Sequence, residues 1–168
     1  MYYPVHIDLT DQNITIIGGG IIALRKCQFF IENKIPITVI AKTFNKAFLA
    51  TTAPMTLIED AYKPAYIKES HLVIVATNDP QLNAEIGHDC REKKKWVNVA
   101  SDAKLSNFII PGVIQRGDLL ISVSTSGKNP RISKEIKETL SEQFGEEYEM
   151  IVATTPRNKV KKDDRSWK

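Results

Sequence analysis

Residues 13–26 read N-I-T-I-I-G-G-G-I-I-A-L-R-K and join a β-branched run to a helix-compatible segment through three glycines. Gly18, Gly20 and Ala23 fit the pattern G-x-G-x-x-A, which opens a dinucleotide-binding βαβ unit. We expect Gly18 to allow the tight turn, Gly20 to let a pyrophosphate approach the backbone, and Ala23 to let the helix pack closely on the sheet. Free N–H groups at the helix start would face the phosphate charge.

Strand-like and helix-like segments alternate over the first two thirds of the chain. Residues 72–76, L-V-I-V-A, form a continuous apolar run, typical of a strand that is buried on both faces. In the first helix we expect Ile22, Cys27, Phe30 and Ile31 to face the sheet. The alternation predicts an α/β fold with a doubly wound parallel sheet. Extended segments are predicted at 5–9, 13–17, 36–41, 55–59, 72–76 and 96–100, and helices at 20–33, 43–51 and 80–94.

The pattern changes after about residue 110. Two strands, 111–115 and 119–124, flank a turn that contains Gly117-Asp118, and a polar loop follows at 125–128. Asn129-Pro130 then starts a helix, with Asn as the N-cap and Pro at the first helical position. Its apolar stripe is formed by Ile132, Ile136 and Leu140. A hairpin and one helix cannot easily form a core alone, so we expect this α/β piece to pack against another subunit in a homodimer.

The end of the chain has a basic and polar composition from Arg157 onward, with cations that include Lys159, Lys161, Lys162 and Arg165. Such a composition is typical of a disordered tail. The sequence therefore predicts three parts, with boundaries at 1–111, 112–150 and 151–168.

Composition excludes several classes of protein. A net charge of +3 over 168 residues is far from that of a dedicated nucleic-acid binder. The N-terminus lacks the pattern of a signal peptide, and the apolar runs are too short to span a membrane. Cys27 and Cys90 are widely separated and do not have metal-ligand spacing. We expect a cytoplasmic protein that has no bound metal and contacts neither membrane nor nucleic acid.

The second predicted strand ends without the acid that usually holds the adenosine ribose of NAD. It reads Ile40-Ala41-Lys42-Thr43, which contains no carboxylate. Lys42 could accept a 2′-phosphate and so favour NADP, whereas Thr43 could donate to a ribose hydroxyl. The glycine loop by itself leaves NAD and NADP open.

Further motifs follow in a fixed order along the chain. They are Tyr2-Tyr3-Pro4, the glycine loop, Ala76-Thr77-Asn78-Asp79 with Leu82-Asn83, Val97-Asn98-Val99 with Ser101-Asp102, Phe108 and Pro111, and Ser122–Pro130. Together they resemble the precorrin-2 dehydrogenase module of sirohaem synthases over about residues 2–150. The resemblance implies a Rossmann domain that binds NAD (1–111) and a small domain for dimerisation and the substrate cleft (112–150). It also implies NAD-dependent removal of two hydrogens from precorrin-2, an anionic tetrapyrrole, to give sirohydrochlorin.

The same resemblance assigns residues to the cofactor by position. It places Gly18, Gly20, Ile21 and Ile22 beside the pyrophosphate. Lys42 and Thr43 fall along the adenosine, where this family also commonly lacks the ribose acid, so NAD is favoured. Thr77 and Asn78 fall near the nicotinamide, at the carboxyl end of a central strand.

The family's essential acid follows the N-V strand, where this chain offers Ser101 and Asp102. Ser101 can fall on the position that some relatives fill with Asp, but only Asp102 has a carboxylate that could accept a proton or orient the macrocycle. A turn aspartate without catalytic function is the alternative. The expected substrate-binding residues are Ser101, Lys104, Arg116, Ser124, Thr125, Ser126, Gly127 and Lys128. Those of the loop 124–127 and the cations, with Arg131, would bind the substrate carboxylates. The alternative for the loop 124–127 is a polar turn with an N-cap.

Two questions stay open at this stage. Some relatives also insert iron into sirohydrochlorin, and the resemblance does not decide whether this chain does so, or whether its product enters sirohaem or a cobalamin-type cofactor. The alternative to an enzyme is a non-catalytic NAD-binding regulatory or sensor domain. Such domains also begin with a strand, a glycine loop and a helix, but they usually keep the ribose acid that is missing here.

Overall fold

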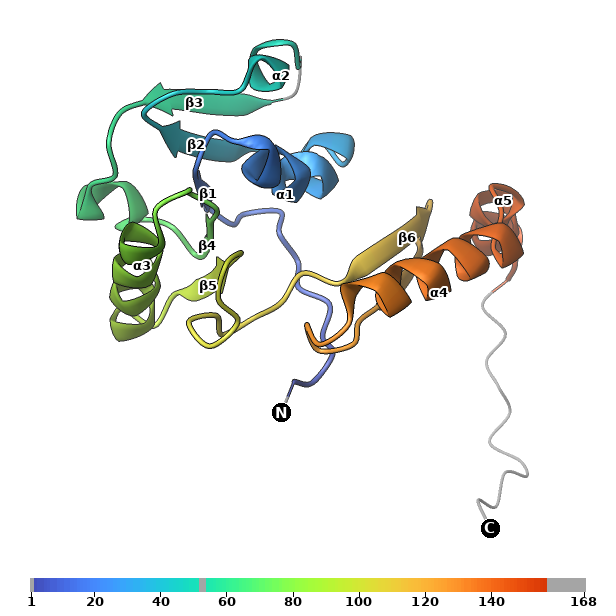
Figure 1. Cartoon of the computed structure of the whole chain (residues 1–168). Helices are drawn as coiled ribbons and strands as arrows, with labels where there is room; N and C mark the ends of the chain where they lie inside the picture. Colours follow the sequence, from blue (N-terminus) through green and yellow to red (C-terminus); the bar gives the residue numbers. More distant parts are fainter. Residues whose placement is uncertain (1, 52–53, 157–168) are drawn as a thin grey trace. The chain divides into compact units, whose positions relative to one another are not determined.

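The structure of the protein, a computed structural model, describes residues 2–51 and 54–156 (Figure 1). The chain divides into two compact units, with the boundary between Ile110 and Pro111. The basic residues Lys159, Lys161, Lys162 and Arg165 lie outside the described residues.

The first unit is built on a sheet of five parallel strands. The chain runs from β1 outward through β2 to β3, then crosses to the other side of β1 for β4 and β5, so the spatial order is β3-β2-β1-β4-β5. This is the predicted doubly wound α/β arrangement, and its switch point lies between β1 and β4. The strands are β1 (Ile14–Ile17), β2 (Ile37–Ala41), β3 (Met55–Glu59), β4 (Leu72–Val75) and β5 (Trp96–Val99).

One face of the sheet is covered by α1 (Ile21–Glu32), whose buried residues are Ala23, Cys27 and Phe30. Ala23 is fully buried, as expected for a residue that lets the helix pack closely on the sheet. The prediction that Ile22 faces the sheet is wrong, because Ile22 lies one position before this stripe and is exposed.

Ile86 and Cys90 of α3 (Pro80–Glu92) belong to a second buried cluster, together with Ile67 of the short 3₁₀ helix η1 (Pro64–Ile67). Val73 and Val75 of β4 point into this cluster, whereas Leu72 and Ile74 belong to the cluster under α1. Since neighbouring residues of a strand point to opposite faces, the two clusters lie on opposite faces of the sheet.

Local signals explain where the helices start and end. The Asp79 side chain accepts hydrogen bonds from the N–H groups of Gln81 and Leu82, so α3 begins as predicted. The helix predicted over 43–51 is only one turn, α2 (Lys46–Leu49), and it starts at Lys46 because Asn45 caps it through the N–H of Ala47. The segment 5–9 forms no strand, and η1 was not predicted.

The second unit contains an antiparallel hairpin of β6 (Gly112–Arg116) and β7 (Leu119–Val123), with α4 (Pro130–Gln143) and α5 (Glu147–Thr154). Asn129 caps α4 by accepting a hydrogen bond from the N–H of Ile132, as predicted. The prediction of a disordered tail from residue 151 is wrong for its first residues, because α5 continues through Thr154. No helix within 2–51 and 54–156 is both long enough and apolar enough to cross a membrane.

Candidate functional site

A cleft of about 610 Å³ opens at the carboxyl ends of the parallel strands in the first unit. Its walls come from the glycine loop after β1 and from the segments that follow β2, β3 and β4. Open α/β sheets bind ligands at this place, beside the switch point. The lining residues are Ile17–Gly20, Ile40–Asn45, Asp60, Tyr62, Ala76–Asp79 and Leu82.

The first two glycines of the loop, Gly18 and Gly19, are required by the packing of the backbone, independently of any ligand. Gly18 has φ +131°, and a Cβ there would lie 2.3 Å from the carbonyl oxygen of Ala76. The tight turn predicted at Gly18 is therefore present. A Cβ on Gly19 would lie 2.2 Å from the carbonyl oxygen of Thr43, so this glycine lets the loop after β2 approach β1. Gly19 stands at an x position of the pattern G-x-G-x-x-A, which assigns it no role, and sequence analysis missed this contact.

Gly20 differs from its neighbours because it is exposed and a Cβ there would meet no atom within 4 Å. It also lines the cleft, so the space that a side chain would fill is open to a ligand. No side chain caps α1 at Gly20, which leaves the N–H groups of its first turn available to an anion. These features fit the pyrophosphate of a dinucleotide.

Ile21 and Ile22 occupy that first turn. Their side chains are 65% and 46% exposed, and neither side chain lines the cleft. Any contact that these residues make with a pyrophosphate would therefore come from their backbone N–H groups, which lie at the positive end of the helix dipole.

The end of β4 is held by a buried amide. Asn83, on α3, is 2% exposed, and its Oδ1 accepts a hydrogen bond of 2.6 Å from the Thr77 hydroxyl. Its Nδ2 donates to the Thr77 carbonyl and to the Ser101 hydroxyl, both at 3.1 Å. Thr77 and Asn78 line the cleft, and Asn83 links this wall to the loop after β5.

Ser101 and Asp102, the two candidates for the position of the essential acid, have different surroundings. Ser101 is exposed, and its hydroxyl belongs to the Asn83 network. Asp102 is half-buried and accepts a hydrogen bond of 2.8 Å from the N–H of Lys104, which closes a turn within its own loop. Neither residue lines the cleft, and Lys104 is exposed. The structure joins Ser101, rather than Asp102, to the end of β4.

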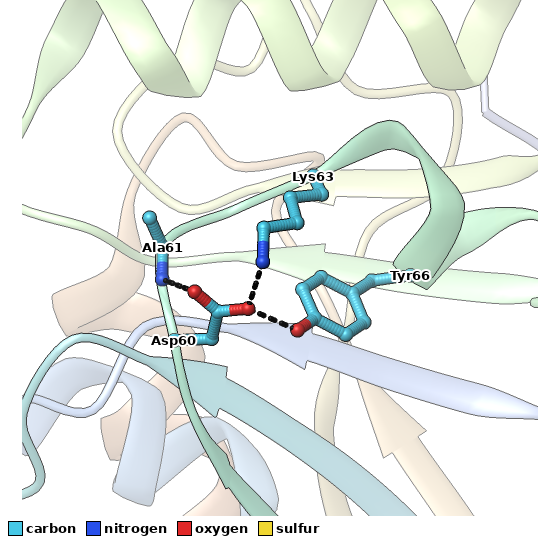
Figure 2. A network of polar contacts seen from close by, with 4 residues as sticks. All are labelled: Asp60, Ala61, Lys63 and Tyr66. Atoms are coloured by element: carbon cyan, nitrogen blue, oxygen red, sulfur yellow. Dashed lines mark hydrogen bonds and ion pairs between the residues drawn. The ribbon is translucent and has the colours of Figure 1, made fainter.

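The other end of the cleft is polar. Lys42 and Thr43 are exposed there, beside Asp60 and Tyr62 from the segment after β3. Asp60 contacts Ala61, Lys63 and Tyr66 (Figure 2). Hydrogen bonds from the Lys63 ammonium and the Tyr66 hydroxyl lower the pKa of Asp60 to about 2. Sequence analysis missed Asp60, although the strand-end rule that selected Thr77 applies equally to a residue directly after β3.

The remaining predicted substrate residues lie in the second unit. Arg116 is mostly buried, donates to the Ser141 hydroxyl at 3.1 Å and pairs with Glu146 at 3.4 Å. The Thr125 hydroxyl donates to the Asn129 carbonyl at 2.9 Å and accepts from its N–H at 3.0 Å. Both side chains therefore hold the second unit together.

Ser124, Ser126, Gly127 and Lys128 are exposed on the loop that precedes α4. Ser126 (φ +55°) and Gly127 (φ +77°) have left-handed backbone, and the Ser124 hydroxyl accepts from the N–H of Ser126. This loop presents polar groups to solvent, next to the N-terminus of α4.

Neither cysteine has the character of a nucleophile. Cys27 and Cys90 are buried, and burial raises the pKa of their thiols to about 12 and about 11. Within 2–51 and 54–156 no group of three or more His, Cys, Asp or Glu side chains is arranged to hold a metal ion.

Comparison with known proteins finds relatives of this chain in sequence and in structure. The siroheme synthase of Tolumonas auensis is 32% identical over 139 residues, and that of Psychromonas ingrahamii is 33% identical over 141. Each match covers 83% of this chain but 30% of the relative, so the chain spans about a third of the length of these relatives. The solved structure of SirC, a precorrin-2 dehydrogenase, is 29% identical with a TM-score of 0.72, and the match covers 90% of this chain and 76% of that one.

A family described as putative NAD(P)-binding matches residues 5–112, which include all five parallel strands and every residue that lines the cleft. The matched residues include the cleft of the first unit, where Gly20 and the uncapped start of α1 leave room for a dinucleotide. This chain belongs to the putative NAD(P)-binding family.

Proposed function

We propose that this chain is an NAD-dependent dehydrogenase that removes two hydrogens from precorrin-2 to give sirohydrochlorin. The observation that carries the proposal is the cleft between Gly20 and Thr77, in a chain that is similar to SirC, a precorrin-2 dehydrogenase, over 90% of its length. A sensor domain would need the nucleotide site alone, whereas the similarity to SirC continues into the second unit.

Bound NAD would supply a hydride acceptor. The backbone at Gly20, Ile21 and Ile22 would hold its pyrophosphate, and Lys42 and Thr43 would lie along its adenosine. Thr77 and Asn78 would border the nicotinamide, with Thr77 fixed by Asn83. The reaction breaks two bonds to hydrogen in precorrin-2, and the substrate loses one hydride to NAD and one proton.

We propose Asp102 as the acceptor of that proton or as the group that orients the macrocycle. The N–H of Lys104 occupies one of its oxygens, so the other can accept a hydrogen bond. Ser101 would lie beside it and contact the substrate. Lys104 and the loop residues Ser124, Ser126, Gly127 and Lys128 would bind substrate carboxylates. Thr125 and Arg116 would support this binding by fixing the fold of the second unit.

We further propose a homodimer formed through the second unit. No residue of α4 is buried, although Ile132 and Ile136 form an apolar stripe on it and are 39% and 42% exposed. The free, buried cysteines suit a reducing compartment, and we propose a cytoplasmic location.

Anaerobic incubation with precorrin-2 tests the reaction. We expect the absorption spectrum of sirohydrochlorin to appear with NAD, and the Gly20→Val variant to be inactive because its side chain fills the cofactor space. A known precorrin-2 dehydrogenase, added to a parallel sample, controls for the substrate. Absence of product with both NAD and NADP, while this control turns over, would leave the sensor alternative. Ferrous or cobalt ion in the same assay tests for chelatase activity.

A further inference from the structure

In the usual fingerprint a carboxylate at the end of β2 binds the adenosine ribose. In this chain β2 ends without a carboxylate, but a carboxylate directly follows the neighbouring strand β3. Ala41 closes β2 and pairs with Glu59 of β3 in parallel register. The next residue, Asp60, donates its N–H to the Ala41 carbonyl at 3.0 Å. A carboxylate therefore lies one strand away from its usual place, at the same edge of the sheet.

Asp60 lines the same cleft as Lys42, Thr43 and the glycine loop. The switch point beside β1 separates the cleft into a β4 end, where Thr77 lies, and a β2–β3 end, where Asp60 lies. With the pyrophosphate at Gly20 and the nicotinamide at Thr77, the adenosine would extend toward Asp60. Its carboxylate is the negative charge at that end of the cleft among the described lining residues.

The Asp60 side chain is held by hydrogen bonds from Ala61, Lys63 and Tyr66 (Figure 2). Its Oδ1 accepts from the N–H of Ala61 at 2.7 Å, and its Oδ2 accepts from Lys63 and Tyr66. The side chain keeps 30% of its surface exposed. A carboxylate has about four acceptor positions, and three are filled here. One position on Oδ1 stays available to a ligand hydroxyl.

We propose that Asp60 selects NAD over NADP: its carboxylate accepts a hydrogen bond from the adenosine ribose and disfavours a 2′-phosphate by charge repulsion. The inference rests on the NAD-dependent function proposed above and names the residue that reads the cofactor. It assigns to β3 the task that a residue at the end of β2 performs in the usual fingerprint.

Lys63 weakens the repulsion between the Asp60 carboxylate and a 2′-phosphate but does not remove it. Its ammonium is bound to Asp60 and offsets part of the charge of that carboxylate. If the carboxylate were neutral, Lys63 would lose this partner, and Lys42 would be a second cation near the adenosine. Loss of the Asp60 charge should thus weaken NAD binding and strengthen NADP binding. Both effects lower the preference for NAD over NADP.

Isothermal titration calorimetry on the full chain, with NAD and NADP and without any tetrapyrrole, tests the proposal. We expect the wild type to bind NAD at least about tenfold more tightly than NADP, and Asp60→Asn to lose that factor, which is the effect of one hydrogen bond to a charged group. Lys63→Met is the matched control. It breaks the same ion pair but keeps the carboxylate, so it should keep or increase the preference for NAD.

A modified ligand provides a second test, which uses the wild type and does not require a variant to fold. The 2′-deoxyadenosine analogue of NAD should bind the wild type about tenfold more weakly than NAD, and Asp60→Asn, where folded, should not distinguish the two ligands. Equal binding of NAD and its deoxy analogue by the wild type, or an unchanged NAD/NADP ratio in Asp60→Asn, overturns the proposal. A chain that prefers NAD but does not oxidise precorrin-2 would remove the proposed reaction and leave the role of Asp60 intact.

Discussion

The side-chain amide of Asn83 donates a hydrogen bond of 3.1 Å to the Ser101 hydroxyl, and so joins α3 to the loop after β5. The Asn83 side chain also accepts a hydrogen bond from the Thr77 hydroxyl and donates one to the Thr77 carbonyl. One buried amide therefore fixes two loops at the carboxyl edge of the sheet.

Asn83→Ala should destabilise the fold. It removes a buried acceptor oxygen and an amide nitrogen that donates two hydrogen bonds, and leaves polar groups of Thr77 without their partner, which costs about 1–3 kcal/mol. Urea unfolding measures this as a lower midpoint. Ser101→Ala loses only the exposed end of the network and should cost less than about 1 kcal/mol. Equal effects of the two variants would contradict a central role for Asn83.

Variants of two glycines in the loop should affect different properties, Gly20 the cofactor affinity and Gly19 the stability of the fold. Gly20→Val should leave the melting temperature nearly unchanged, because its side chain meets open space, but should weaken NAD binding by at least about tenfold. Gly19→Ala should lower stability by about 1–3 kcal/mol, because its Cβ collides with the Thr43 carbonyl. Thermal unfolding and calorimetric titration of both variants measure the two effects. Unchanged NAD affinity in Gly20→Val would disprove the pyrophosphate assignment.

Asp102 and Ser101 can be distinguished by turnover. Asp102→Asn should keep NAD affinity, because Asp102 does not line the cleft, and should slow dehydrogenation by roughly 10²–10⁴-fold if its carboxylate accepts the proton. Ser101→Ala serves as the comparison, since it changes the neighbouring position without removing a charge. If only Ser101→Ala slows the reaction, the catalytic role passes from Asp102 to Ser101.

The parts of the fold that sequence predicted well are governed by local signals. The strand β4 (Leu72–Val75) lies within the continuous apolar run 72–76, and Asn129-Pro130 places a capping side chain and a fixed φ at the start of α4. The glycine fingerprint also has local spacing. Each of these features depends on residues that lie close together in the chain.

The features that sequence missed depend on contacts between distant segments. Gly19 is required by the Thr43 carbonyl, which comes from the loop after a different strand. Asn83 joins residues that lie 6 and 18 positions away in the chain. Asp60 reaches the cleft only because β3 pairs with β2. Spacing along the chain marks residues at strand ends, but it does not show which of them meet at one cleft until the strand order is known.

Stability should fall in alkaline solution because of the two buried thiols. Burial raises the pKa of Cys27 to about 12 and that of Cys90 to about 11, from an ordinary value of 9.0. Above pH 9 the thiols of the unfolded chain ionise while the folded ones keep their protons, so the free energy of unfolding decreases as pH rises toward 11. Urea titrations at pH 7.5 and pH 10.5, roughly on either side of the unfolded pKa, measure the change. The double variant Cys27→Ala/Cys90→Ala should show a smaller decrease, and an equal decrease would assign the effect to other groups.

The proposed dimer depends on the apolar stripe of α4. Ile132 and Ile136 are one turn apart on the same side of the helix and are both exposed in the single chain. Replacing both with lysine should place two charges in a subunit interface and give a monomer, without harming the second unit itself, whose buried residues Ile114 and Val123 lie on the hairpin. Sedimentation velocity measures the mass. Glu138→Lys is the control, because it adds a lysine to the opposite side of α4, where Glu138 pairs with Lys134 in solvent. We expect the control to remain dimeric, and a dimer that survives both lysines would show that the subunits associate through another surface.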